Sequence, residues 1–113
     1  MHEVGIIRSA LDTALRLAQA AGASRIHRLS MRVGAMTGVV PDALAFAFEV
    51  IRQGTMAAGA ELKIETVAVS CWCANCRQEF TSEDLLYECP QCRQTSSELR
   101  NGRQLELVSV EIS

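Results

Sequence analysis

The stretch CANCRQEFTSEDLLYECPQC, residues 73–92, contains two CxxC units separated by 12 residues. In each unit, two thiols held by one tight turn can face a common point, so two units supply four sulfur ligands. Four thiolates suit a tetrahedral Zn²⁺ ion with Zn–S distances of about 2.3 Å. The spacing therefore predicts a structural zinc site formed by Cys73, Cys76, Cys89 and Cys92, with no open coordination position for catalysis.

Two other interpretations of these cysteines stay open to different degrees. Disulfides are disfavoured, because a cytoplasmic chain keeps its thiols reduced, whereas iron also accepts four thiolates and is not excluded by the spacing. Arg77 and Arg93 each follow the second cysteine of a pair. They either offset the negative charge of the thiolates or are ordinary surface arginines. The fifth cysteine, Cys71, is expected to be a spare, partly buried thiol rather than a ligand.

The cysteines belong to a segment of distinct composition, residues 70–103, which also contains the only Trp and the only Tyr. A piece of about 30 residues normally needs a staple, and a metal ion provides one. We therefore expect a zinc-binding module inserted between two strands that pair antiparallel, with the module at their tip. The turn sequence RNGR, residues 100–103, is expected to close a hairpin within this module.

The rest of the chain shows helix and strand periodicities. Apolar residues recur at helical spacing over Val4–Ala21, and a second helix is expected to begin near Pro41 and to end before Gly54. Alternating or β-branched runs predict three strands, at residues 28–33, from 61 towards 69, and at 104–112. The last of these changes its apolar phase between Leu107 and Val108, which indicates a β-bulge.

These patterns predict an α+β fold, with two helices on a small mixed three-stranded sheet and an inserted zinc-ribbon-like module. The expected domains are an α/β domain, residues 1–69 plus 104–113, and the zinc-binding module, residues 70–103.

Composition narrows the class of protein. Of the 113 residues, 49% are apolar, which is enough to form a hydrophobic core. The net charge of −2 argues against a general nucleic-acid binder, which would carry a basic surplus. No apolar run is long enough to cross a bilayer, and no signal peptide is visible, so we expect a cytoplasmic protein. The chain lacks a glycine-rich phosphate loop and a nucleophile motif, so we do not expect an enzyme.

The chain begins MHE, and these three residues can chelate one ion. The amine of Met1 and the amide nitrogen of His2 close a five-membered ring, and the same amide and the His2 imidazole close a six-membered ring. Such donors suit Ni²⁺ or Cu²⁺ in a square plane, with Glu3 or a partner's ligand as the fourth donor. Taken alone, the residues are better explained by Glu3 favouring a helix start and by His2 as an exposed end residue. His27 is expected to be structural.

The whole chain resembles the HypA family of hydrogenase maturation and nickel incorporation proteins. The resemblance rests on the MHE start, on RVGAMTGVVPDALAFAFEVIRQGT in the middle, and on AELKIE followed by CWCANC and CPQC. Paired CxxC units alone occur in many zinc ribbons. Their combination with MHE and with the order of strands and helices is much more specific.

The resemblance implies a nickel metallochaperone for [NiFe]-hydrogenase, and in some members for urease. By motif match, His2 is the nickel ligand with Glu3 beside it, and the four paired cysteines hold structural zinc. The implied partners are the GTPase HypB and the hydrogenase large-subunit precursor, without nucleic acid or membrane, and a homodimer is compatible with the family. The alternative is a zinc-ribbon module that binds proteins or nucleic acids.

Overall fold

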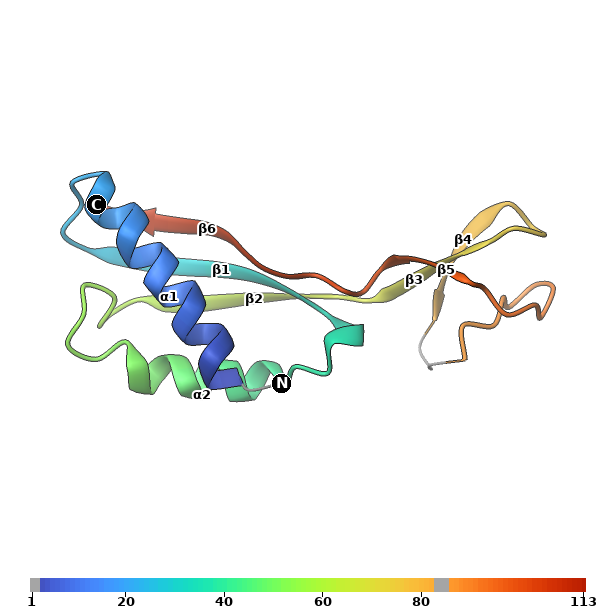
Figure 1. Ribbon diagram of the computed structural model, residues 1–113, viewed down its shortest axis with the longest axis horizontal. Coiled ribbons are helices and arrows are strands. Elements are labelled where there is room, and N and C mark those ends of the chain that lie inside the picture. Colours follow the sequence, from blue (N-terminus) through green and yellow to red (C-terminus); the bar gives the residue numbers. More distant parts are fainter. Residues whose placement is uncertain (1–2, 83–85) are drawn as a thin grey trace.

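The computed structural model describes residues 3–82 and 86–113. The chain is elongated, with principal extents of 54 × 24 × 16 Å, and its two ends are built from two different sheets (Figure 1). The helices are α1 (Glu3–Ala20), the short 3₁₀ helix η1 (Ala35–Thr37) and α2 (Pro41–Ile51). The strands are β1 (Ile26–Gly34), β2 (Glu61–Val67), β3 (Val69–Cys73), β4 (Gln78–Ser82), β5 (Glu98–Asn101) and β6 (Leu105–Ile112).

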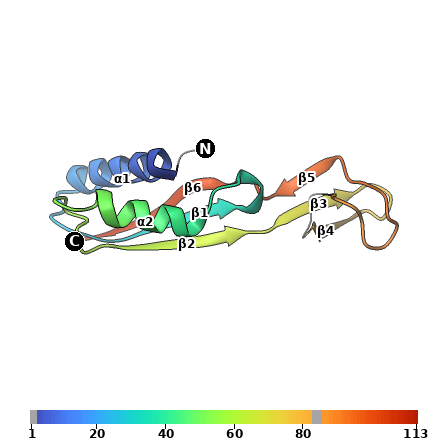
Figure 2. The same cartoon turned by 90° about the horizontal axis from the view of Figure 1, so that it is seen from below.

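The larger sheet has the strand order β2-β1-β6, with β2 parallel and β6 antiparallel to β1. Both helices lie on the same face of it (Figure 2). The predicted mixed three-stranded sheet with two helices is therefore confirmed. The expected direct pairing of the two strands that flank the cysteine module is wrong, because β1 lies between them and takes the hydrogen bonds of both.

The core of this larger sheet forms where the apolar stripes of α1 and α2 meet the covered face. Ile7, Leu29, Leu44 and Phe48 are each at most 2% exposed. Smaller alanines on the helices let the elements approach closely, and Leu105 and Leu107 of β6 pack against the edge of the cluster. Burial of these side chains is the main favourable term for this half of the molecule.

The open face of the larger sheet is polar and ordered by charge. Two rows of side chains cross its three strands, namely Glu61–Arg28–Glu111 and Glu65–Arg32–Glu106, with N–O distances of 3.1 to 3.6 Å. Between the rows, Ser30 lies opposite Lys63. This face is exposed to solvent because alternate residues of each strand point away from the core, and those residues are polar.

The predicted bulge in the last strand is confirmed. Ser30 of β1 pairs with Ser109 and Met31 pairs with Leu107, so Val108 has no partner in the ladder. An extra residue of this kind turns the side chains that follow it to the other face and increases the local twist.

The smaller sheet has the order β4-β3-β5, all antiparallel, and carries the cysteine-rich segment. With residues 83–85 left aside, its buried cluster consists of five residues, Val69, Cys71, Cys73, Phe80 and Cys89. Met36 of η1 reaches this cluster from the other half of the molecule, and its Sδ accepts a hydrogen bond of 2.8 Å from the Tyr87 hydroxyl. A cluster of this size is too small to stabilise a module alone.

The two sheets meet at a close backbone contact between Gly34 and Gly102. The Gly34 N–H donates to the Gln104 carbonyl (2.6 Å), and the Met36 N–H donates to the Gly102 carbonyl (2.8 Å). Gly102 has φ of +121°, which glycine adopts without strain. The expected RNGR hairpin is therefore wrong: β5 and β6 belong to different sheets, and Gly102 forms the joint between them.

Within the two described stretches of the chain, neither helix has the length and apolarity that crossing a bilayer requires.

Candidate metal centres

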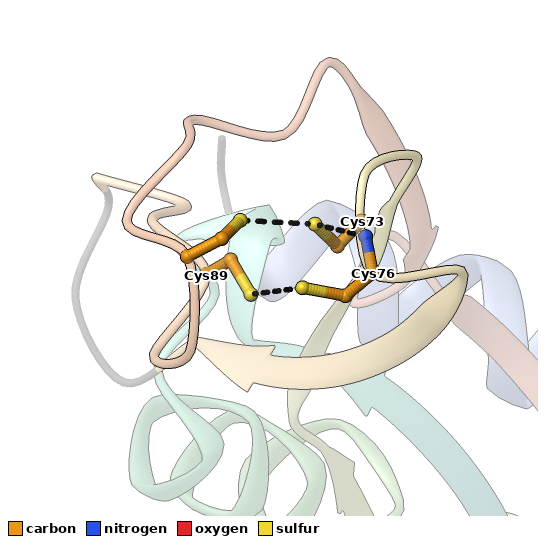
Figure 3. A group of neighbouring side chains, drawn as sticks. Cys73, Cys76 and Cys89 are labelled. Atoms are coloured by element: carbon orange, nitrogen blue, oxygen red, sulfur yellow. Dashed lines mark hydrogen bonds between the residues drawn. The ribbon is translucent and has the colours of Figure 1, made fainter.

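Four cysteines from opposite ends of the module come together in the structure. The sulfurs of Cys73, Cys76, Cys89 and Cys92 all lie within 4.8 Å of one another. The Cys73 and Cys92 sulfurs are 3.5 Å apart, and those of Cys76 and Cys89 are 4.0 Å apart (Figure 3). A tetrahedral ion with Zn–S bonds of about 2.3 Å needs sulfurs about 3.8 Å apart, so the group can hold such an ion.

Each CxxC unit is held by a tight turn. The Cys76 N–H points to the Cys73 sulfur (3.4 Å), and the Arg93 N–H bonds the Cys89 carbonyl (2.9 Å). The residues directly after the units, Arg77 and Arg93, have φ of +53° and +67°. This left-handed conformation is uncommon for a residue with a side chain, and it reverses the chain so that both sulfurs of a unit face the same side.

Contacts between the two turns fix their relative position. The Gln78 amide donates to the Gln91 amide oxygen at 2.7 Å, which ties the first turn to the second. The Cys89 N–H bonds the Gln94 carbonyl at 2.9 Å. The four-sulfur group is thus prearranged by the chain, as a structural centre requires.

The crowded thiols perturb each other's protonation. A backbone hydrogen bond from Gln94 lowers the pKa of Cys92 to about 6, with smaller contributions from neighbouring side chains. A hydrogen bond with Cys92, followed by burial, raises the pKa of Cys76 to about 12. Since metal ligation requires thiolates, binding of an ion must release protons from this group.

The other residues singled out around the centre have separate environments. Cys71 is 1% exposed and is not part of the four-sulfur group, and burial raises its pKa. It is more deeply buried than expected. Arg93 is largely exposed and pairs with Glu88 at 3.6 Å, while Arg77 is also exposed.

At the other candidate centre, the structure begins at Glu3. Met1 and His2, the other expected nickel ligands, lie outside the described residues. Glu3 is the first residue of α1, and its carboxylate accepts a hydrogen bond of 3.4 Å from the Val40 N–H, directly before α2. This contact joins the starts of the two helices.

His27, the second histidine, is exposed on β1 and is not part of the four-sulfur group. Its Nε2 is 2.6 Å from the Ser113 hydroxyl, and the backbone of Arg25 pairs with Ser113 next to it. The contact ties the C-terminal end of β6 to the start of β1, which agrees with a structural role.

Two contacts near the centres could not be anticipated from local patterns. Met36 of η1 joins the small cluster of the module, and the Val40 N–H, directly before α2, donates to Glu3. Each contact links residues far apart in the chain. Local spacing and alternation of residue types do not indicate such pairs.

Fold and site together define a small α+β protein with a prearranged four-cysteine metal centre. The family model described as "Hydrogenase/urease nickel incorporation, metallochaperone, hypA" matches residues 1–112. The chain belongs to the HypA family.

Related proteins agree with this assignment, and two solved structures share the fold. A hydrogenase maturation factor HypA from a Picosynechococcus species is 47% identical, with 99% of each chain covered. One from Chloroflexus aurantiacus is 42% identical, with 98% of each chain covered. The solution structure of the Ni metallochaperone HypA from Helicobacter pylori has a TM-score of 0.67 at 24% identity, covering 99% of this chain and 97% of that one. A further solution structure of HypA protein has a TM-score of 0.73 at 23% identity, covering 100% and 97%.

Proposed function

We propose that this chain is a nickel metallochaperone that binds Ni²⁺ at its N-terminus and passes it on for the maturation of [NiFe]-hydrogenase, and of urease where one is present. The observation that carries this proposal is the match of the nickel-incorporation family over residues 1–112, which includes the MHE start. The protein catalyses no reaction in this proposal. Its cargo is bound, held and released.

The proposed nickel ligands are the Met1 amine, the His2 amide nitrogen and the His2 imidazole. Glu3 supplies the fourth donor, through its backbone nitrogen or its carboxylate. The Glu3 carboxylate lies 3.4 Å from the Val40 nitrogen at the start of α2. Such nitrogen donors favour square-planar Ni²⁺ over Zn²⁺.

We propose that Cys73, Cys76, Cys89 and Cys92 hold a structural Zn²⁺ ion. The support is the distance between paired sulfurs, which is 3.5 Å in one pair and 4.0 Å in the other. These distances lie on either side of the value of about 3.8 Å that a tetrahedral zinc thiolate centre requires. A shell of four protein thiolates leaves no position for a substrate, so this ion would stabilise the module and take no part in binding the cargo.

The proposal divides the chain into a nickel-binding domain, residues 1–69 with 104–113, and a zinc module, residues 70–103. Release of the cargo in one direction requires a source of energy. The proposed partners are therefore the GTPase HypB and the hydrogenase large-subunit precursor, in the cytoplasm. Nucleic acid and membrane have no part in this function, and a homodimer is compatible with it.

The first test is Ni²⁺ titration of untagged protein by calorimetry, with metal content measured by mass spectrometry. We expect His2→Ala to lose Ni²⁺ binding and to keep one zinc ion per chain. His27→Ala is the matched control, because it removes the other histidine, whose only described contact is with Ser113. It should bind Ni²⁺ like the unmodified protein. Undiminished Ni²⁺ binding by His2→Ala would overturn the proposed site.

Acetylation of the terminal amine tests the role of Met1 separately. We expect weaker Ni²⁺ binding after acetylation, because the amide that replaces the amine has no basic lone pair. A group of the same size as the acetyl group, attached at the C-terminus, should leave Ni²⁺ binding unchanged. Unchanged binding after acetylation would remove Met1 from the ligand set and leave His2 in place.

A further inference from the structure

A hollow of about 180 Å³ lies at the joint between the two sheets, where β5 ends and the chain continues into β6. Its lining consists of Leu99, Arg100, Asn101, Arg103 and Gln104. The hollow is far along the chain from the N-terminus and is not formed by the four paired cysteines. It has no part in the function proposed above.

Arg103 brings an uncompensated charge to this hollow. Over residues 3–82 and 86–113, its side chain makes no hydrogen bond or ion pair, and the residue is exposed. By contrast, Arg28 and Arg32 of the larger sheet each pair with two glutamates. A guanidinium presents five N–H donors in one plane, so an unpaired one at a hollow offers a binding site for an anion.

Arg100 is aimed and stiffened by its neighbours. Cys71 pairs with Leu99 and Ser70 pairs with Asn101, so Arg100 is the extra residue of a bulge, which redirects its side chain. Its guanidinium carbon lies 4.6 Å from the centre of the Trp72 ring. Contact through the ring face leaves the N–H groups at the edge of the guanidinium available to a ligand.

The chain's own Glu98 already offers a carboxylate to Arg100, at 3.3 Å. Both side chains are about half exposed, so the pair is weak and a second acid can compete with it. This contact shows the kind of ligand that suits Arg100.

The two amides of the lining complete a set of donors. Asn101 donates to the Ser70 hydroxyl (2.9 Å), and Gln104 donates to the Asn101 amide oxygen (3.0 Å). The Gln104 amide oxygen accepts from the Gly102 N–H (2.8 Å). Each amide nitrogen therefore keeps one hydrogen that these bonds do not use, while each amide oxygen is already engaged.

We propose that this hollow binds a carboxylate of an acidic segment of a partner protein, with Arg100 and Arg103 as its charged donors. Positive charge, planar donors and unused amide hydrogens select an oxyanion, and the Glu98 contact favours a carboxylate over a phosphate.

The test uses the full-length, zinc-loaded protein and an acetylated tetraglutamate peptide, with tetraglutamine as the uncharged comparison. Trp72 is the only tryptophan in the chain, so its emission reports changes at the neighbouring Arg100. We expect a saturable change with tetraglutamate and none with tetraglutamine. Arg103→Gln should weaken binding roughly tenfold, as expected for loss of a charge-assisted hydrogen bond.

Two further variants sharpen this test. Glu98→Gln removes the competing acid and should strengthen binding of the peptide, while Arg8→Gln, on the exposed side of α1, should leave it unchanged. An equal loss in Arg8→Gln and Arg103→Gln would show non-specific attraction and overturn the proposal. Absence of saturable binding would overturn it too, and so would inorganic phosphate displacing the peptide at equal concentration. Circular dichroism and zinc content verify that each variant is folded.

Discussion

Replacing Cys89 by serine should release the metal ion from the four-cysteine centre and unfold β3, β4 and β5, while the larger sheet and its helices stay folded. Cys89 is fully buried and belongs to a buried cluster that has five members among the described residues of the module. A cluster of that size cannot offset the entropy of ordering the segment. For small metal-bound modules the binding free energy, about 10–16 kcal/mol for zinc-finger peptides, is the folding free energy.

Two measurements check this result. Metal content should fall from one ion per chain to none, and amide signals of the module should collapse to unfolded positions while those of α1 and β1 persist. Cys71→Ala is the matched control, because Cys71 is equally buried and lies outside the sulfur group. It should keep its metal ion and lose about 1–2 kcal/mol of stability. A Cys89→Ser protein that retains one ion per chain would contradict the assignment of the centre.

Gly34→Ala should destabilise the protein by about 3 kcal/mol, because it forces a methyl group against the backbone of Gly102 and Arg103 at the joint between the two sheets. A Cβ atom on Gly34 would lie 2.1 Å from the Gly102 carbonyl oxygen and 2.8 Å from the Arg103 nitrogen. Backbone atoms cannot move aside as a flexible side chain can. The two hydrogen bonds of the joint, from Gly34 to Gln104 and from Met36 to Gly102, would both be lost.

Gly5→Ala provides the control for this change. Apart from its own stretch of α1, no described residue has an atom within 4 Å of a Cβ at Gly5, which is in the first turns of that helix. This variant should be stabilised by about 0.5 kcal/mol, because alanine favours the helix over glycine. Denaturant unfolding followed by circular dichroism compares the two variants, and hydrogen exchange locates the change in Gly34→Ala. Unaltered protection of Met36 and Gln104 amides would show that the joint tolerates the methyl group.

Patterns with a short range in sequence predicted their structures well. The helical spacing from Val4 gives α1 with a shift of one residue at each end, and the change of phase at Val108 gives the bulge. The two CxxC units predicted that their four sulfurs would come together, which the structure bears out. In each case the signal and the structure depend on the same few neighbouring residues.

Pairings between distant segments were not predictable in the same way. The strands that flank the module follow each other in the chain and would be expected to pair. In the structure β1 lies between them, because its apolar face packs under both helices. The RNGR segment has the residues of a hairpin turn, but the contact of Gly102 with Gly34 requires it at a joint instead. The turn propensity of a short sequence contributes less free energy than a tertiary contact of this kind, so the tertiary contact determines the structure.

The rows of opposite charge on the open face of the larger sheet also determine how β2 aligns with β1. Sliding β2 by one residue would turn its glutamates and lysine into the apolar interior. Sliding it by two would place Lys63 opposite Arg28 in one direction, or opposite Arg32 in the other, in place of the favourable Glu61 and Glu65 partners. The ion pairs therefore favour one register of a parallel pairing whose partners are 33 residues apart in the chain. Concentrated salt should weaken this electrostatic preference before it weakens the hydrophobic core.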